Sequence, residues 1–413
     1  MYNILITGGL GYIGSHTIVE LNKNELNINE NNKNKINKKK ININENNINE
    51  NNINENNINE NNINENNKTK NNKTENCQTT NNKSKNYNLI VIDNLSNSSS
   101  DIINNIEKLI SPNKLIFFRG DILNTGLLIH IFTTYHIDAV IHFASLKSVG
   151  QSVDNPLLYH YNNVGGTINL LTVMENFNVR NLIFSSSATV YGAQQSPFTK
   201  DYVSGCGGSY PPFTEDLSTG NDITNPYGKT KFIIEEMLKD LKNWNIIILR
   251  YFNPIGAHES GLIGENPIGI PNNLMPYILN VGKYNKTNAN YNHLKVFGND
   301  YDTVDGTCIR DYIHVVDLAK AHVKALEKLL HNDLININIY NLGSGKGTSV
   351  LELINTFQLV NNVEIPYKFY PKRQGDISQS YCVADKAYKE LNWKTEKTIE
   401  DMCKDSWNFI NTK

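Results

Sequence analysis

The chain has 413 residues, which leaves room for one large domain or two ordinary ones. Its formal net charge of −2 excludes a strong general attraction to nucleic acid or to an anionic membrane. Five cysteines without a CxxC spacing favour reduced thiols over a disulfide framework or a zinc site. No apolar run approaches the roughly 20 residues that would cross a bilayer. The first strand begins at residue 3, which leaves no room for a cleaved signal, so we expect a cytoplasmic protein.

The N-terminal segment NILITGGLGYIGSHTIVEL is typical of a buried strand, a glycine-rich turn and a helix. Gly8, Gly11 and Gly14 stand at GxxGxxG spacing, which lets the backbone approach a pyrophosphate at the helix N-terminus. A glycine triplet alone is weak support for a nucleotide site. Its position between an apolar strand and a helix makes the prediction of a dinucleotide site specific.

Residues 22–86 are dominated by Asn, Lys, Glu, Ile and Thr, with the pentapeptide INENN repeated without interruption over 43–67. Ile at every fifth position fits neither a strand nor a helix, so no continuous face can be buried. We expect a disordered, low-complexity loop, with self-association through Asn ladders as the alternative. Because the loop joins a helix to a strand, it should lie at the sheet edge opposite the ligand.

The strand YNLIVID, residues 87–93, ends in Asp93, the expected acidic partner of the glycine turn. With the insertion set aside, its distance from Gly14 is somewhat shorter than the usual spacing of about 20 residues. An Asp at this position binds ribose hydroxyls and repels a 2′-phosphate, and Asn94 follows it instead of Arg or Lys. Both features favour NAD over NADP.

Further strands are expected in KLIFFRGDI, which ends near Asp121, in DAVIHFASLKSVG and in VRNLIFSSSATVYG. Helical segments such as NVGGTINLLTVMENF alternate with them. This alternation predicts a doubly wound, mostly parallel α/β sheet of the Rossmann type.

Tyr227 and Lys231 stand one helical turn apart in NPYGKTKFIIEEMLKD, so both face the same side of the predicted helix. Tyr291 and Lys295 have the same spacing but lie in a polar stretch. Ser187 closes the strand LIFSSS that precedes the first pair. A strand-end hydroxyl that faces Tyr and Lys is typical of a proton-transfer group, because a phenolate needs positive charge near it at neutral pH. The alternative is that these are ordinary strand-end and helix-surface positions.

Beyond the glycine turn, the segments VIHFASLKSVGQSV, FSSSATVYG, NPYGKTKFIIEEM, LRYFNPIGAHESGLIGE, GIPNNLMPY, VFGNDYDTVDGT and RDYIHVVDLAKAH resemble the UDP-glucose 4-epimerase family of extended short-chain dehydrogenases/reductases. The resemblance covers nearly everything except the Asn-rich insertion and a shorter one between Gln194 and Pro211. It implies an NAD-dependent isomerase that interconverts UDP-glucose and UDP-galactose, as in galactose metabolism. It also implies a homodimer joined by a helical bundle, with a UDP-hexose substrate.

The resemblance carries roles over to individual residues. The cofactor set comprises Gly8, Gly11, Tyr12, Ile13 and Gly14 at the pyrophosphate, Asp93 and Asn94 at the adenosine ribose, Asp121 and Ile122 at the adenine, and Phe143, Lys147, Asn163 and Tyr251 along the remainder. Tyr227 would be the base, Lys231 would hold the nicotinamide ribose, and Ser187 with Thr189 would bond the reacting hydroxyl. The uridine diphosphate would meet Asn253, Asn273, Leu274, Phe297, Arg310, Arg373 and Asp376. Two arginines suit a diphosphate, because the guanidinium fork matches phosphate oxygens.

Two departures from the family pattern stand out: Ser145 replaces the usual glycine in FASLK, and the 194–211 segment is longer. Ser380 occupies a position where the family carries either Tyr or a small residue, so the resemblance implies that UDP-N-acetylhexosamines also fit. If the alignment is off by one residue, Tyr381 would line the pocket instead. A sugar-nucleotide dehydratase is a weaker alternative, since no Asp-Glu pair follows Ser187. A non-enzymatic NAD-binding module is another, although this chain keeps both Tyr and Lys.

The expected domain organisation is an NAD-binding domain over 1–252, interrupted by the insertion at 22–86, and a smaller α/β substrate domain over 253–413. Residues 310–345 are expected to return in part to the first domain. No metal site and no nucleic-acid or membrane partner are expected.

Overall fold

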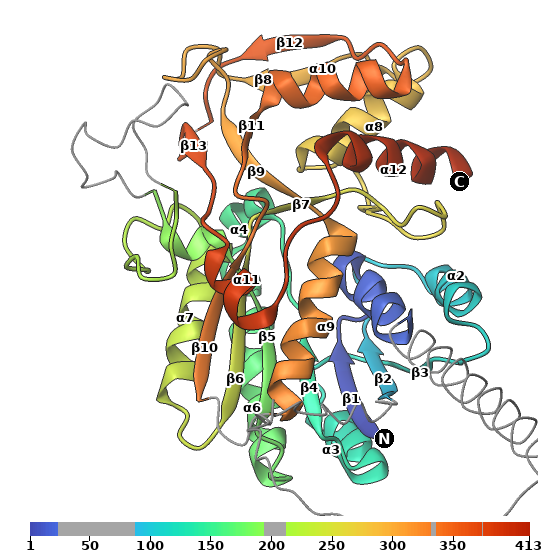
Figure 1. Cartoon of the computed structure of the whole chain (residues 1–413), viewed down its shortest axis with the longest axis vertical. Helices are drawn as coiled ribbons and strands as arrows, with labels where there is room; N and C mark the ends of the chain where they lie inside the picture. Colours follow the sequence, from blue (N-terminus) through green and yellow to red (C-terminus); the bar gives the residue numbers. More distant parts are fainter. Residues whose placement is uncertain (24–86, 194–211, 332–335, 374) are drawn as a thin grey trace, which may run out of the picture. The chain divides into compact units, whose positions relative to one another are not determined.

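The computed structural model describes residues 1–23, 87–193, 212–331, 336–373 and 375–413 (Figure 1). Met1–Asn22 and Tyr87–Lys413 form one compact unit. The predicted loops over 22–86 and 194–211 lie outside the described residues, apart from Asn22 and Lys23. The same holds for the predicted disorder or self-association of the Asn-rich repeat.

A sheet of seven parallel strands forms the centre of the larger part, in the order β10-β6-β5-β4-β1-β2-β3. The strands are β1 (Tyr2–Thr7), β2 (Tyr87–Asp93), β3 (Ile116–Arg119), β4 (Ala139–His142), β5 (Asn181–Ser187), β6 (Asn245–Tyr251) and β10 (Ile337–Leu342). The strand order reverses between β1 and β4, which is where open α/β sheets bind ligands at the carboxyl ends of their strands.

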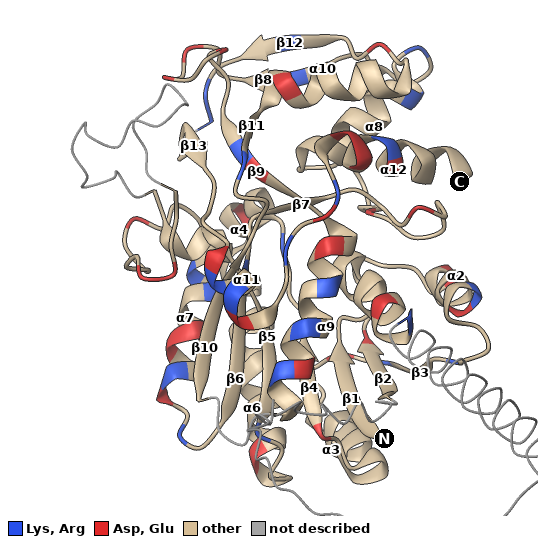
Figure 2. Cartoon of the chain, viewed as in Figure 1, with Lys and Arg blue, Asp and Glu red and all other residues tan. Residues whose placement is uncertain are grey.

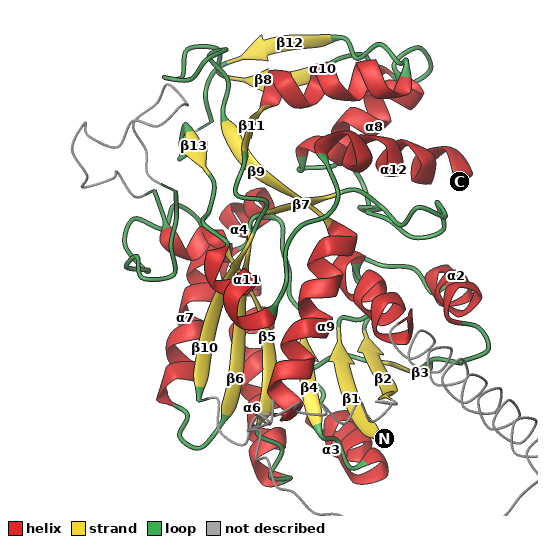
Figure 3. Cartoon of the chain, in the orientation of Figure 1, coloured by secondary structure: helices red, strands yellow, loops and turns green. Residues whose placement is uncertain are grey.

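Helices cover both faces of this sheet, as Figure 3 shows. One face packs against the helix of residues 12–23, α2 (Asp101–Ile110), α9 (Val315–His331) and α11 (Asp385–Leu391). The other packs against α3 (Thr125–Tyr135), α6 (Gly166–Asn176) and α7 (Pro226–Asp240). Apolar strands buried on both faces are what a parallel sheet requires. The predicted doubly wound α/β fold is confirmed.

The path from β4 to α6 runs through three short helical pieces. These are α4 (Val149–Asp154), α5 (Pro156–Tyr159) and the π-helical turn η1 (His160–Gly165). The π-turn interrupts an otherwise α-helical stretch with hydrogen bonds of the wider i→i+5 type. Such turns are frequent at functional sites.

A smaller part is built mainly from residues after Tyr251. β7 (Asn253–Ile255), β9 (Ile309–His314), β11 (Gly347–Ser349) and β13 (Gln379–Ser380) form one sheet, and β8 (Leu294–Phe297) with β12 (Tyr367–Tyr370) forms a second. They pack with α8 (Leu274–Tyr284), α10 (Val350–Asn361) and α12 (Ile399–Thr412) around a separate apolar core. The domain division after residue 252 stays a prediction, although β10 and α9 do lie with the large sheet.

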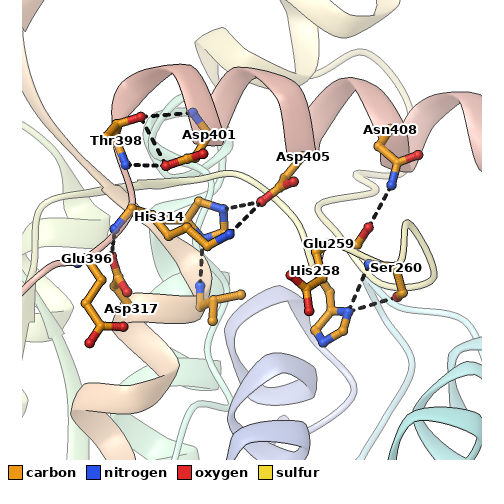
Figure 4. Close-up of polar contacts among 12 residues, drawn as sticks. His258, Glu259, Ser260, His314, Asp317, Glu396, Thr398, Asp401, Asp405 and Asn408 are labelled. Carbon is orange, nitrogen blue, oxygen red and sulfur yellow. Dashed lines mark hydrogen bonds and ion pairs between the residues drawn. The ribbon is translucent and has the colours of Figure 1, made fainter.

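Polar contacts hold α12 against the end of β9, as Figure 4 shows. His314 Nε2 lies 3.1 Å from Asp405 Oδ2. The backbone N–H groups of Glu396 and Lys397 donate to Asp317 Oδ2, each at 2.9 Å. Thr398 caps α12 reciprocally with Asp401. The helix therefore has a fixed start and a fixed side contact.

The first helix continues further than the sequence indicated. Asn22 was placed in the insertion, but it is helical and buried. Its Nδ2 donates to Ile18 O at 2.9 Å, and its Oδ1 accepts from Asn113 Nδ2 at the same distance. The folded framework therefore includes Asn22, whose amide joins the helix end to the segment after α2.

Charged residues of both signs occur along α7 and α9, as Figure 2 shows. Among the described residues, no helix combines the length and apolar character needed to cross a membrane. In the same residues, no group of three or more His, Cys, Asp or Glu side chains is arranged to hold a metal ion.

Candidate active site

The glycine turn after β1 is packed tightly against the end of β4. Gly8 has φ of +68°, and a Cβ there would lie 2.6 Å from Ala144 N. A Cβ on Gly14 would lie 2.7 Å from Gly8 O. These positions tolerate no side chain, so the backbone alone forms this surface at the start of the 12–23 helix. Such a surface fits the pyrophosphate of a dinucleotide.

Asp93 ends β2 and is joined to the same turn. Its Oδ2 accepts from Leu10 N at 3.0 Å, and its Oδ1 accepts from Leu95 N at 2.9 Å and from Ser98 Oγ at 3.1 Å. The carboxylate is buried and held in one orientation. The two oxygens keep lone pairs beyond these three bonds, so the group also fits ribose hydroxyls.

Asn94 and Asp121, from neighbouring strand ends, are brought together by the structure. Asn94 Nδ2 donates to Asp121 Oδ2 at 2.7 Å, and Leu123 N donates to Asp121 Oδ1 at 2.9 Å. Ile122 is buried, and a Cβ on Gly166 would lie 2.5 Å from its Cδ1. The predicted ribose and adenine residues therefore form one continuous border beside the glycine turn.

Aromatic residues predicted along the cofactor are anchored by other elements. The Tyr12 hydroxyl donates to Gly256 O at 2.7 Å, with Ile13 following it in the same helix. The Phe143 ring lies 4.9 Å from the His322 ring, and Tyr251 Oη lies 2.5 Å from His322 Nε2. His322, on α9, was not predicted from the sequence, yet it contacts two of the predicted residues.

The turn containing Ser145, Leu146 and Lys147 is fixed by Asn163. Asn163 accepts from Leu146 N at 2.8 Å and donates to Leu146 O at 3.0 Å and to Thr230 Oγ1 at 3.1 Å. Ser145 Oγ donates to Leu146 O at 3.2 Å, so the serine is accommodated within the turn. Asn163 therefore acts as a connector between this turn and α7.

Lys147 contacts the residues that precede α8 through an acidic side chain. Its Nζ lies 2.8 Å from Glu265 Oε1, which also accepts from Asn273 Nδ2 at 3.1 Å. Asn273 is the N-cap residue of α8, and Leu274 is the first residue of that helix. Glu265 thus joins a predicted cofactor residue to a predicted substrate residue, although it was not predicted itself.

Ser187, Thr189 and Tyr227 lie together where β5 ends and α7 begins. Thr189 donates to Ser187 Oγ through its N–H at 3.2 Å and through its Oγ1 at 3.0 Å. Asn225 caps α7, with its Oδ1 accepting from Gly228 N at 2.8 Å. Burial raises the pKa of the Tyr227 phenol to about 12, while a hydrogen bond with Ser187 lowers it. A base at neutral pH therefore needs added positive charge.

Lys231 supplies a positive charge at the required place. Its Nζ lies 5.9 Å from the centroid of the Tyr227 ring and donates to Ser185 O at 2.7 Å. Burial lowers the pKa of this ammonium to about 7, and the charge of Glu235 raises it. The alternative pair is different in kind: Tyr291 lies in the short turn η3 (Ala289–Tyr291), and Lys295 lies in β8. They share no helix.

Two charged side chains beside this group were missed by the sequence reasoning. Glu235 and Arg250 form a buried ion pair, with 2.6 Å between Arg250 Nη2 and Glu235 Oε2. A signal was present: Arg250 interrupts the apolar strand NIIILRY, and Glu235 follows Lys231 by one helical turn. A charge within a buried strand is expected to have a partner.

Two of the residues predicted at the uridine diphosphate, Arg310 and Arg373, contact one carboxylate, that of Asp376. Arg373 Nε lies 2.8 Å from Asp376 Oδ2, and Arg310 Nη2 lies 3.8 Å from Asp376 Oδ1. The Arg373 guanidinium stacks 5.0 Å from the centroid of the Phe297 ring. Two guanidinium groups and one aromatic ring are therefore already gathered. Asn253 begins β7.

Ser380 lies in β13, paired in register with Arg310 of β9. Ser380 is the last residue of β13, and Tyr381 follows it outside the strand. The Tyr381 carbonyl accepts from Phe213 N at 2.8 Å, which holds this segment to the other side of the site.

The chain is similar to known proteins along most of its length. The family model described as "NAD dependent epimerase/dehydratase family" matches residues 77–343. The UDP-glucose 4-epimerase of Bacillus subtilis is 41% identical over 98% of this chain and 96% of its own length. The chain belongs to the NAD-dependent epimerase/dehydratase family. This match to the UDP-glucose 4-epimerases confirms the resemblance drawn from the sequence motifs.

Solved structures of the family superpose over nearly the whole chain. UDP-glucose 4-epimerase from Stenotrophomonas maltophila, with bound NAD and formylated UDP-arabinopyranose, gives a TM-score of 0.77 at 36% identity, covering 100% of this chain and 98% of that one. The enzyme from Bifidobacterium longum, in complex with NAD+ and UDP, gives 0.75 at 38% identity, covering 99% and 98%. The family is NAD-dependent, and the glycine turn with Asp93 fits that cofactor.

Proposed function

We propose that this protein interconverts UDP-glucose and UDP-galactose, using NAD as a cofactor that is regenerated in each turnover. The observation that carries the proposal is the grouping of Ser187, Tyr227 and Lys231 at the carboxyl end of the large sheet. A turn that accepts no side chains and a fixed carboxylate, Asp93, stand at the same edge of the sheet. The relatives with this name extend over nearly the full chain.

The residues of this chain would divide the work as follows. Tyr227 takes the proton from the hydroxyl on carbon 4 of the sugar, and the Lys231 ammonium stabilises the phenolate, since the pKa of Tyr227 in the free protein is about 12. Ser187 and Thr189 hold the reacting oxygen. NAD, held by the glycine turn and Asp93, would supply the hydride chemistry at carbon 4.

Inversion at carbon 4 requires the 4-keto sugar to rotate while its diphosphate stays bound. Arg310 and Arg373 supply the fixed end, because their guanidinium groups both lie next to the Asp376 carboxylate. A guanidinium pair holds phosphate oxygens by charge and by directed hydrogen bonds. Weak contacts with the hexose and strong contacts with the diphosphate together allow rotation without release.

A sugar-nucleotide dehydratase is less well supported. That chemistry needs a further acid and base, and Ser187 is followed here by Ala188, Thr189 and Val190. An NAD-binding module without activity would have no use for a Tyr-Lys pair buried beside a strand-end hydroxyl.

The test is to measure UDP-galactose conversion and NAD content in the purified protein and two variants. Tyr227→Phe should keep its NAD and lose turnover by roughly 10²–10⁴-fold, the usual contribution of a positioned proton-transfer group. Tyr291→Phe, the matched control, should equal the parent. Full activity of Tyr227→Phe, or an inactive parent that contains NAD, would contradict the proposal.

We also propose that UDP-N-acetylglucosamine and UDP-N-acetylgalactosamine are substrates. The small side chain at Ser380, beside Arg310 in the β9–β13 pairing, supports this extension. An N-acetyl group enlarges the volume that the sugar sweeps as it turns, and a small residue leaves that volume free.

We propose a homodimer as the working form. An exposed apolar surface, which we call the helical patch, lies along α4, α5, η1 and α6 and comprises Val149, Val153, Leu157, Leu158, Tyr161 and Ile168. Large apolar side chains exposed along consecutive helices support a protein interface here. The described cysteines Cys308, Cys382 and Cys403 are free and buried, which supports a reducing, cytoplasmic location.

A further inference from the structure

The proposed catalytic group comes from two elements whose relative position must be fixed. Ser187 ends β5, whereas Tyr227 and Lys231 lie on α7. The residue just before Ser187 makes a direct contact between these elements: Ser186 Oγ donates to Glu235 Oε1 at 2.5 Å. Together with the hydrogen bond from Lys231 to Ser185 O, this bond attaches α7 to two successive residues at the end of β5.

The Glu235 carboxylate also binds β6, the next strand of the sheet. Arg250, on β6, donates through Nε to Glu235 Oε1 at 3.0 Å and through Nη2 to Oε2 at 2.6 Å. Ser186 and Arg250 are paired in register across β5 and β6. Glu235 has no exposed surface, and Arg250 is 2% exposed. The bidentate geometry fixes orientation as well as distance.

The contacts continue away from α7 without an unpaired group. Arg250 Nη1 donates to Tyr191 Oη at 2.9 Å, and Tyr191 Oη donates to Asn341 Oδ1 at 2.7 Å. Asn341 Nδ2 donates to Phe213 O at 3.1 Å. A buried network whose members are all satisfied is rigid.

We infer that Glu235 is a positioning residue for the reaction: through Ser186 and Arg250 it fixes Ser187 relative to Tyr227 and Lys231. The inference rests on the proposed function. Holding the layers together would not by itself require a carboxylate, since an apolar pair of similar volume often stabilises as well. The Ser186 contact, adjacent to the catalytic serine, is what an apolar pair could not provide.

The negative charge of Glu235 also supports the reaction, because it favours the protonated form of Lys231. The pKa of Lys231 is lowered by burial and raised by the charge of Glu235. The other titratable groups around this centre are Tyr227 on α7, His142 on β4, Tyr159 on α5, and Arg250 and Tyr251 on β6. Burial lowers the pKa of His142 to about 3, so it stays neutral near pH 7. Removing the Glu235 charge leaves Arg250 unopposed, which lowers the pKa of Lys231 further.

The experiment compares Glu235→Gln, Ser186→Ala and Glu236→Gln in the NAD-containing enzyme, with UDP-galactose as substrate. Glu236 is on the same helix, half-exposed and paired with Lys239 at the surface, so its variant should match the parent. Glu235→Gln should lower kcat by about 10²-fold, the scale of a small misplacement of reacting groups, with KM within about twofold. Its high-pH limb of kcat should also move to lower pH. Ser186→Ala should lower kcat by about tenfold without that shift.

A double variant, Glu235→Leu with Arg250→Met, decides the case if Glu235→Gln does not fold. It replaces the ion pair with apolar side chains and should fold while kcat stays low. Parental kcat in the double variant, or in both Glu235→Gln and Ser186→Ala, would overturn the inference. Tyr227→Phe separates the two ideas. If it is inactive and those variants are fully active, only the positioning role fails, whereas an active Tyr227→Phe refutes the proposed function.

Discussion

At the scale of single residues, burial opposes the charge that the chemistry needs on Lys231. Its pKa is lowered from 10.5 to about 7, so between these values the unfolded chain binds a proton that the folded chain has released. Stability therefore rises with pH across this window, by up to about 1.4 kcal/mol per pH unit. Lys231→Met removes the effect. We expect the unfolding free energy of the parent to rise relative to that of this variant between about pH 7 and pH 10.

The matched control is Lys229→Met, an exposed position two residues earlier on the same helix. Urea unfolding at several pH values should show a constant difference between this variant and the parent. A constant difference for Lys231→Met as well would show that the Lys231 ammonium is not destabilised by burial.

Ser380 is the residue on which the choice of sugar is expected to depend. Ser380→Tyr should remove activity on UDP-N-acetylgalactosamine while sparing UDP-galactose, because overpacking a protein wall costs about 1–3 kcal/mol, or roughly 5- to 150-fold. Both activities are measured on the same preparations. Tyr381→Ser serves as the comparison, since Tyr381 is the next residue in the chain and follows β13 directly. If Tyr381→Ser alone changes the ratio of the two activities, the pocket is lined by Tyr381 and the assignment is wrong.

The sequence reveals the site residues that stand in local patterns, but not those whose roles depend on long-range pairing. Gly8, Asp93, Ser187 and Tyr227 were found because each stands at a strand end or helix start with a recognisable spacing. Glu265 and His322 were not found, because their partners Lys147 and Tyr251 lie 118 and 71 residues away in the chain. Glu235 was missed although Arg250, 15 residues away, gave a signal. Their role depends on which helix the fold places beside which strand. The catalytic and binding roles themselves remain predictions.

At the scale of elements, the N-terminal end of α7 is important for the position of the proposed catalytic residues. Asn225 caps the helix that carries both Tyr227 and Lys231. Asn225→Ala should cost about 1 kcal/mol of stability, as loss of an N-cap usually does, and should lower kcat because the first helical turn frays. Thr398→Ala removes the corresponding cap of α12, which carries none of the catalytic residues, at a similar cost in stability. Kinetics and thermal unfolding of both variants give the comparison. Equal kcat in the two would show that the cap only stabilises.

The first five strands of the large sheet were predicted because their apolar pattern is local, whereas β6 and β10 were not named. The π-turn at His160–Gly165 was not, because the residues around it read as an ordinary amphipathic helix. The short strands β7, β11 and β13 were also missed. Each has three residues or fewer, and they form only because distant segments pair with β9.

At the scale of the whole molecule, the helical patch predicts self-association. Leu157→Asp places a charge on a side chain that is 82% exposed, and it should shift the protein from dimer to monomer in sedimentation velocity. Leu359→Asp is the control, since Leu359 on α10 is 84% exposed but lies outside the patch. A dimer that survives Leu157→Asp, or one lost in Leu359→Asp, would place the interface elsewhere.

The position of the Asn-rich insertion predicts that the enzyme works without it. The described chain breaks after the 12–23 helix and resumes at Tyr87, which pairs with Tyr2 at the start of β1. This is the edge where the strands begin, opposite the edge where Asp93 and Ser187 end theirs. Connections of 2–6 residues suffice between a helix and a strand. Replacing residues 24–86 with a short Gly- and Asn-containing turn should therefore leave kcat within about threefold of the parent and NAD content unchanged.

The matched deletion removes two further residues and starts at Asn22. It takes away the amide that bonds to Ile18 O and Asn113, so it should lower the unfolding free energy by about 1–3 kcal/mol, the cost of leaving a buried partner unsatisfied. Loss of NAD from a folded 24–86 deletion would show that the insertion supports the cofactor site. Equal stability of the two deletions would place the true end of the first helix before Asn22.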